Sequence, residues 1–223
     1  MLDFPKTTSV NKFIPKTQFY NKADMSSRLK NALQNDVERV TWAFKLSPDT
    51  LNISAKSWPE IEVLRIDVRN VNYDSGILKT IDAAIPYPIL FIIKKDTLTK
   101  VAISYKEPNK KNENTAKVDT LFETDWNDEK IKNIEIKGLV TDVIYANFLN
   151  QVAGEKLSFV TAETNKTEIK ATLEDVRGDV ERMKEREKIQ RQIDALTRKI
   201  NAEPSIGKKQ ELAEERYRLK QLL

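Results

Sequence analysis

The sequence predicts an α+β body with a mixed, mostly antiparallel sheet and flanking helices, followed by a C-terminal helical hairpin or coiled-coil tail. Between residues 24 and 152, segments with the apolar patterns of strands are interspersed with short helical segments. After residue 171, apolar residues recur at the three- and four-residue spacing of a narrow helical seam. We therefore expect a body over residues 1–155, a linker over 156–170 and an interaction tail over 171–223.

The N-terminal part predicts an arm, a helix and a strand in that order. The first twenty residues have the composition of an extended arm with four apolar anchors, Phe4, Ile14, Phe19 and Tyr20. Asp24 or Ser26 is positioned to cap a short helix that ends near Gln34. Residues 37–46 alternate between apolar and polar side chains, which indicates a half-buried strand.

The middle of the body begins with its clearest strand, residues 61–68. Asp74 or Ser75 then caps a predicted helix over 76–84, which Pro86 and Pro88 prevent from continuing.

The second half of the body predicts a hairpin, a loop, a strand and a helix. The hairpin joins strands over 89–94 and 101–105, and a lysine- and asparagine-rich surface loop follows over 106–116. A strand over 118–126 and a helix over 139–152 complete the body.

The tail has a helical seam that requires a partner. Its apolar positions are Val176, Val180, Met183, Ile189, Ile193, Leu196 and Ile200. Pro204 and Gly207 interrupt the pattern before a second helix from about residue 208 to 223. The first helix is longer than the second, so we expect the seam to bind another protein or a second copy of the chain. The alternatives are that the two helices close on each other or that the stripe packs on the body. The residues expected to bind a partner are Ile189, Ile193, Leu196, Ile200, Leu212 and Leu219.

The composition of the 223 residues excludes several classes of site. Histidine and cysteine are absent, which removes catalytic triads, thiolate nucleophiles and the commonest zinc ligands. We expect no cofactor, no bound metal and no enzymatic activity, although carboxylates with a divalent metal, or a lysine, remain chemically open.

The same composition excludes disulfides, and the N-terminus lacks the pattern of a signal peptide. The longest apolar stretch, residues 87–93, is too short to cross a membrane. We expect a cytoplasmic protein that has no membrane partner.

One lysine-rich region is a candidate for nucleic-acid contact. The net charge is only +4, so the sequence neither requires nor excludes DNA. Tyr105 offers a stacking surface within this region, whereas Glu107 and Glu113 dilute its charge, as in an ordinary solvated loop. The candidate residues are Lys94, Lys95, Lys100, Lys106, Lys110 and Lys111.

Glu60, Glu62 and Asp67 surround the strand over 61–68, where metal-dependent nucleases place carboxylates. Glu62 and Asp67 are separated by an odd interval, so a regular strand directs them to opposite faces and they are not expected to share a metal. Solvated strand charges are the simpler interpretation.

Four segments of the chain resemble a bacterial family, the domain of unknown function numbered forty-three ninety-one. They are residues 1–8, 44–53, 81–91 and 200–212, and the Lys-Leu-Ser-Pro and Ile-Pro-Tyr-Pro sequences are the most specific. The resemblance implies genes encoded beside DNA methyltransferases and superfamily-two helicases in type III-like restriction and phage-defence loci. It carries no catalytic residues.

Together these observations predict a non-enzymatic accessory or adaptor subunit of a methyltransferase and helicase system, which assembles through its C-terminal helices and has DNA as a further candidate partner. Two alternatives stay open. One is a metal-dependent nuclease-like effector that uses Glu62 or Asp67, and the other is a stand-alone DNA-binding module.

Overall fold

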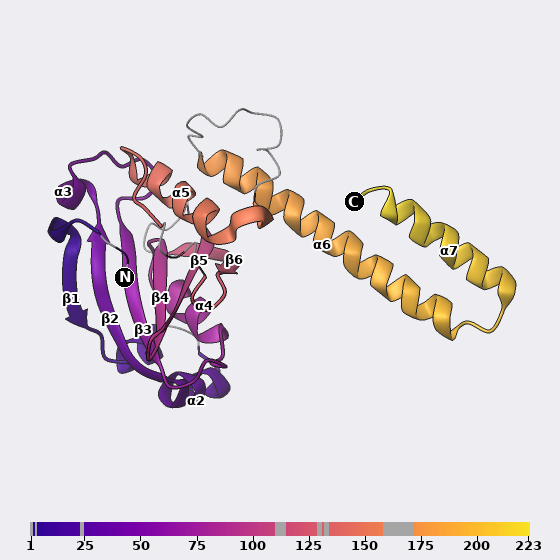
Figure 1. Cartoon of the computed structure of the whole chain (residues 1–223), viewed down its shortest axis with the longest axis horizontal. Coiled ribbons are helices and arrows are strands. Elements are labelled where there is room, and N and C mark those ends of the chain that lie inside the picture. Colours follow the sequence, from indigo (N-terminus) through magenta and orange to yellow (C-terminus); the bar gives the residue numbers. More distant parts are fainter. Residues whose placement is uncertain are drawn as a thin grey trace. The chain divides into compact units, whose positions relative to one another are not determined.

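Six strands lie side by side in sequence order and form one sheet in the part of the chain that the structure describes (Figure 1). The computed structural model describes residues 2, 4–22, 25–109, 115–128, 131, 134–157 and 172–223. β3 and β4 are parallel, and every other neighbouring pair is antiparallel, which confirms the predicted sheet. The strands are β1 (Ser9–Phe13), β2 (Val37–Leu46), β3 (Ile61–Val68), β4 (Ile89–Lys95), β5 (Leu98–Pro108) and β6 (Ala116–Glu123).

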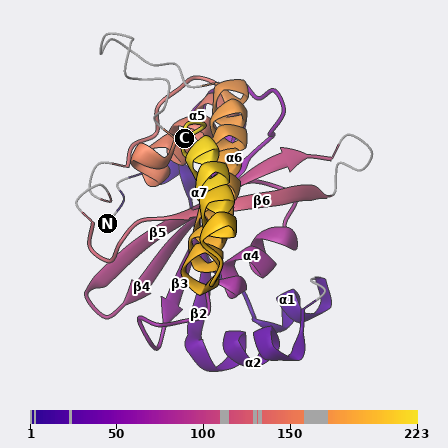
Figure 2. The ribbon, with the colours of Figure 1, turned by 90° about the vertical axis from the view of Figure 1, so that its right-hand side faces the viewer.

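The chain divides into two compact units, residues 1–176 and residues 177–223. The first unit contains the sheet and its helices; α2 and α5 lie toward opposite ends of the sheet in both ribbon views (Figures 1 and 2). The helices are α1 (Thr17–Lys22), α2 (Ser27–Asp36), α3 (Pro48–Leu51), α4 (Gly76–Ala83) and α5 (Thr141–Ala153), with the 3-10 turns η1 (Lys6–Thr8) and η3 (Gly154–Lys156).

For α2 and α4, the structure shows which of the candidate capping residues accepts a hydrogen bond at the start of the helix. Ser26 caps α2, where its hydroxyl accepts a hydrogen bond from the amide of Leu29 at 3.4 Å. At α4 the carboxylate of Asp74 accepts from the amide of Gly76 at 2.9 Å, whereas Ser75 makes no side-chain cap. α4 joins β3 to β4, the parallel pair that requires a crossover connection.

One face of the sheet packs against α2 and α4. Alternate residues of each central strand point to this face, because successive side chains of a strand point in opposite directions. The resulting apolar core includes Leu33, Val40, Leu64, Ile66, Ile77, Leu78, Ile81, Phe91 and Ile93.

The second face of the sheet is buried at its α5 end. Val63, Leu90 and Ile92 point to this second face and are also buried. Phe148 of α5 stacks on Phe4 with ring centroids 6.0 Å apart. Phe4 also meets Phe44, the register partner of Val63, edge-on at 5.3 Å. The first unit therefore has helices on both faces of its sheet.

Asp142 fixes the start of α5 to the segment before β3. Its carboxylate accepts hydrogen bonds from three consecutive backbone amides, those of Lys56 at 3.2 Å, Ser57 at 3.0 Å and Trp58 at 3.3 Å. Further along α5, the hydroxyl of Tyr145 donates to the carbonyl of Ser104 and accepts from the amide of Lys106, both at 2.6 Å. These two residues flank an irregularity in the pairing of β5 with β6, so Tyr145 satisfies backbone groups that the bulge leaves unpaired.

Three predictions about the body were wrong. The N-terminal arm is not simply extended, because residues 9–13 pair with β2 and residues 17–22 form α1. β5 continues to Pro108 through the first residues of the predicted loop, and β6 ends at Glu123, three residues earlier than expected. Strand pairing decided these boundaries, and pairing leaves little signal in local sequence.

The second unit holds the helical hairpin that the sequence predicts. α6 (Leu173–Ala202) begins in the first unit and supplies the longer helix, and α7 (Ile206–Lys220) supplies the shorter one. The two helices pack together through half-buried Leu212 and Leu219 and a hydrogen bond from Arg216 to Thr197 at 3.4 Å. Pro204 ends the first helix as expected, but Gly207 lies inside α7 and does not adopt a positive φ.

Candidate functional site

The predicted partner-binding seam lies at the interface of α6 and α7. Ile189, Ile193 and Leu196 are buried, with exposed fractions of 8%, 4% and 6%. The other three residues of the prediction, Ile200, Leu212 and Leu219, are half-buried. The seam is thus largely occupied within the hairpin, and its role in binding a second protein stays a prediction.

The apolar side chains that α7 exposes are different ones. Ile206 is 83% exposed, Tyr217 65% and Leu222, just after the helix, 65%. The sequence pattern placed Leu222 on the same side of the second helix as Leu212 and Leu219, but it did not select Ile206 and Tyr217. A shallow groove along α7 is lined by Gln210, Ala213, Glu214, Tyr217 and Arg218.

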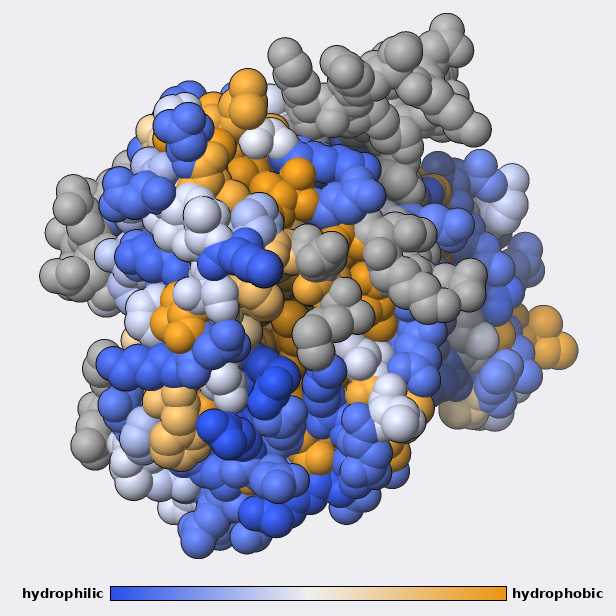
Figure 3. Space-filling view, turned by 60° about the vertical axis from the view of Figure 1, so that its left-hand side comes forward, coloured by the Kyte–Doolittle hydropathy of each residue, from blue (hydrophilic) through white to orange (hydrophobic). Residues whose placement is uncertain are grey.

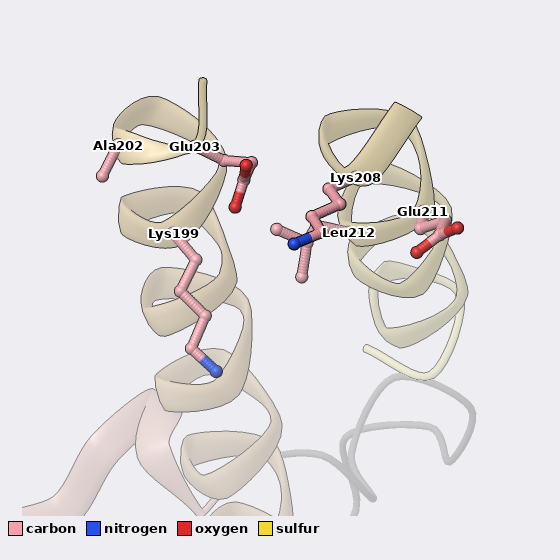
Figure 4. A pocket seen from close by; sticks show the side chains of 6 residues that line it. All are labelled: Lys199, Ala202, Glu203, Lys208, Glu211 and Leu212. Carbon is pink, nitrogen blue, oxygen red and sulfur yellow. The ribbon is translucent and has the colours of Figure 1, made fainter. Parts of the chain in front are cut away.

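A second groove lies between the helices near their connection. Its volume is about 480 Å³. Figure 4 shows Glu203 at the end of α6 opposite Lys208 and Leu212 of α7, with Lys199 one turn below. Glu211 and Ala202 complete the lining. The lining of this groove combines the apolar Ala202 and Leu212 with charged side chains of both signs.

The predicted lysine cluster does not form one surface. Lys94 points to the α5 face of the sheet, whereas Lys95 and Lys100 point to the other face. Lys95 pairs with Asp96 at 2.5 Å and Lys100 with Glu123 at 3.3 Å. Lys110 and Lys111 lie outside the described residues.

Lys106 is not available to nucleic acid, so this part of the prediction was wrong. Its side chain is fully buried, and its Nζ lies 2.7 Å from Oδ1 of Asp82, which is buried as well. The same Nζ donates to the carbonyls of Asp82, Ile85 and Tyr87, each at 2.7 Å. Burial lowers the pKa of Lys106 and raises that of Asp82, and the contact between them opposes both shifts. The role of this lysine is structural.

The carboxylates of β3 do lie on opposite faces. Glu62 points toward the α4 side together with Leu64, whereas Asp67 points to the other side and pairs with Arg65 at 3.2 Å. Among the described residues, no three Asp or Glu side chains come close enough to hold a metal ion. Glu62 and Asp67 therefore cannot bind the same ion.

Glu60 and Glu62 instead form a pair that sequence reasoning missed. Glu62 is 7% exposed, and its buried Oε2 has no hydrogen-bond partner in the described part of the chain. Burial, followed by the charge and contact of Glu60, raises the pKa of Glu62 to about 8, while Trp42 and Lys45 act in the opposite direction. Lys45 forms an ion pair with Glu60 and has a raised pKa, chiefly because of that contact. The pair can hold one proton near neutral pH.

Comparisons with known proteins identify a family. The family described as "Domain of unknown function (DUF4391)" matches residues 2–223. No curated protein and no solved structure matches the chain. Among the described residues, no helix is both long and apolar enough to cross a membrane.

Proposed function

The chain belongs to the DUF4391 family, and we propose that it is a non-enzymatic accessory subunit whose C-terminal hairpin binds a larger protein. The observation that carries this proposal is the exposed apolar surface of α7. Ile206 and Tyr217 expose more than half of their area, 83% and 65%, and neither contributes to the core of the hairpin. Exposed apolar side chains on a helix are typical anchors of a protein interface, and tyrosine is enriched at interface hot spots.

The composition of the hairpin supports binding to protein rather than to a small molecule. Beside Tyr217, the groove along α7 is lined by Glu214 and Arg218, with Gln210 and Ala213. A rim of both charges around a small apolar centre is the usual anatomy of a protein interface. A helix that presents such a face is commonly bound in an apolar groove of its partner.

We propose that the partner is a DNA methyltransferase or helicase subunit of a restriction or phage-defence system. The support is the genomic context that the resemblance implies, in which such genes lie beside those of methyltransferases and helicases. An accessory role also fits a chain without histidine or cysteine. Self-association through the same surface is the competing outcome.

The experiment is affinity purification of the tagged full-length protein from its host, with mass spectrometry of the proteins that co-elute. The Ile206→Ala/Tyr217→Ala variant should lose the partner. Leu139→Ala is the matched control, because Leu139 is 80% exposed and lies in the other unit. Recovery of the methyltransferase or helicase with the wild type and the control, but not with the double variant, is the expected result. Equal recovery with all three proteins would remove the hairpin surface from the proposal.

A further inference from the structure

Two neighbouring rows of side chains cross the sheet on the face opposite α4, at the ends of the strands. The strand registers place Phe13, Thr41, Arg65 and Ile92 in the first row. The second row contains Arg39, Asp67, Lys94 and Thr99. Adjacent strands are about 4.8 Å apart, so the charged groups of both rows lie within three strand spacings.

This surface combines an exposed aromatic ring with cationic groups. Phe13 is 51% exposed, and the guanidinium of Arg39 lies 5.5 Å from the centroid of its ring. Arg65 and Lys94 are half-buried, and Lys94 forms no ion pair with the described residues. Among the described residues of the two rows, Asp67 is the one carboxylate beside the three cations, so the rows carry an excess of positive charge.

Two buried polar atoms in the first row have no hydrogen-bond partner among the described residues. They are Oγ1 of Thr41 and Nε of Arg65, which belong to register partners on β2 and β3. Buried polar groups are normally hydrogen-bonded, so these two neighbouring groups mark a place where an ordered water is accommodated.

We propose that this sheet surface, formed by Phe13, Arg39, Arg65 and Lys94, binds single-stranded nucleic acid. Phe13 supplies the face on which a base stacks, and Arg39 orders the ring from one side. Arg65 and Lys94, which lie two and three strands away from Phe13, supply phosphate contacts. A single strand is favoured over a duplex because stacking requires a base whose face is free. The surface lies in the first unit and is independent of the α7 surface proposed above.

Hairpin-surface and sheet-surface substitutions separate the two proposals. The Ile206→Ala/Tyr217→Ala variant should bind nucleic acid like the wild type, and Phe13→Ala should recover the protein partner like the wild type. Failure of one proposal therefore leaves the other intact.

The test is fluorescence anisotropy of a labelled oligodeoxythymidylate with the full-length protein at several salt concentrations. Phe13→Ala should weaken binding by about fivefold or more, the loss expected for one stacked base. Lys94→Ala should make the slope of log affinity against log salt shallower by about 0.7. Asp67→Asn should tighten binding, because it removes the one carboxylate that faces the cations.

Two controls and one competitor make the test specific. Leu139→Ala removes an exposed apolar side chain elsewhere, and Lys79→Ala removes an exposed lysine from α4 on the opposite face; both should bind like the wild type. Polyglutamate with the same total negative charge as the oligonucleotide should not displace it. The proposal is overturned if the wild type does not bind at low salt, if Phe13→Ala and Lys94→Ala bind like the controls, or if polyglutamate or duplex DNA competes equally well.

Discussion

Lys106 and Asp82 form an ion pair in the interior of the sheet unit, with Nζ 2.7 Å from Oδ1 and neither side chain exposed to solvent. The pair connects β5 to the end of α4. Lys106 also donates to three carbonyls at that end, where a helix leaves acceptors without internal partners and where a positive charge is favourable.

The variant Lys106→Met should lower the free energy of unfolding by about 3–5 kcal/mol, because it leaves a buried carboxylate without its counter-charge. Chemical denaturation measures the change. The Asp82→Leu/Lys106→Met double variant should recover part of the loss, since it removes both charges, but not all of it, since the carbonyls of Ile85 and Tyr87 stay unpaired. A cost below about 1 kcal/mol for Lys106→Met would contradict this account.

Glu62 should make the stability of the protein depend on pH. Its pKa is about 8 in the folded state and 4.5 ordinarily, so between these values the folded state holds a proton that the unfolded state has lost. The free energy of unfolding should therefore fall as pH rises through this window, at about 1.4 kcal/mol per pH unit where the dependence is steepest.

Thermal denaturation between pH 4 and pH 9 measures this effect. Glu62→Gln should flatten the profile and make the protein more stable than the wild type near pH 8, because a neutral amide needs no proton. Glu38→Gln is the control, since Glu38 is exposed on the neighbouring strand. Parallel profiles for the wild type and Glu62→Gln would show that Glu62 is already ionised at neutral pH.

Asp142 should contribute strongly to the docking of α5. Asp142→Ala leaves three consecutive amides without their acceptor and should cost at least about 3 kcal/mol of stability. Asp142→Asn retains one acceptor oxygen and should give an intermediate loss, measured by urea denaturation. If Asp142→Asn were as stable as the wild type, the carboxylate charge would have no role in the contact.

The strongest local patterns predicted their elements well. β2 and β3 have the predicted bounds, residues 37–46 and 61–68, because their apolar residues repeat over eight or more positions. The break at Pro204 was predicted for a stereochemical reason that holds in any context.

The polar sites could not be predicted in the same way. Lys106 and Asp82 are 24 residues apart, and a lysine among other charged residues gives no sign that it is buried. The raised pKa of Glu62 depends first on burial, which the sequence of β3 alone does not show. The row that joins Phe13 to Arg65 depends on the pairing of β1 with β2, which the expected extended arm did not include.

The most direct test of the central claim is the binding affinity of the purified full-length protein for the purified methyltransferase and helicase subunits, measured by calorimetry. We predict a complex that Tyr217→Ala weakens by more than about fivefold, as expected for an interface anchor, and that Leu139→Ala leaves unchanged. Absence of binding to either subunit, or equal affinities for the wild type and Tyr217→Ala, would contradict the assignment of the α7 surface as the site of assembly.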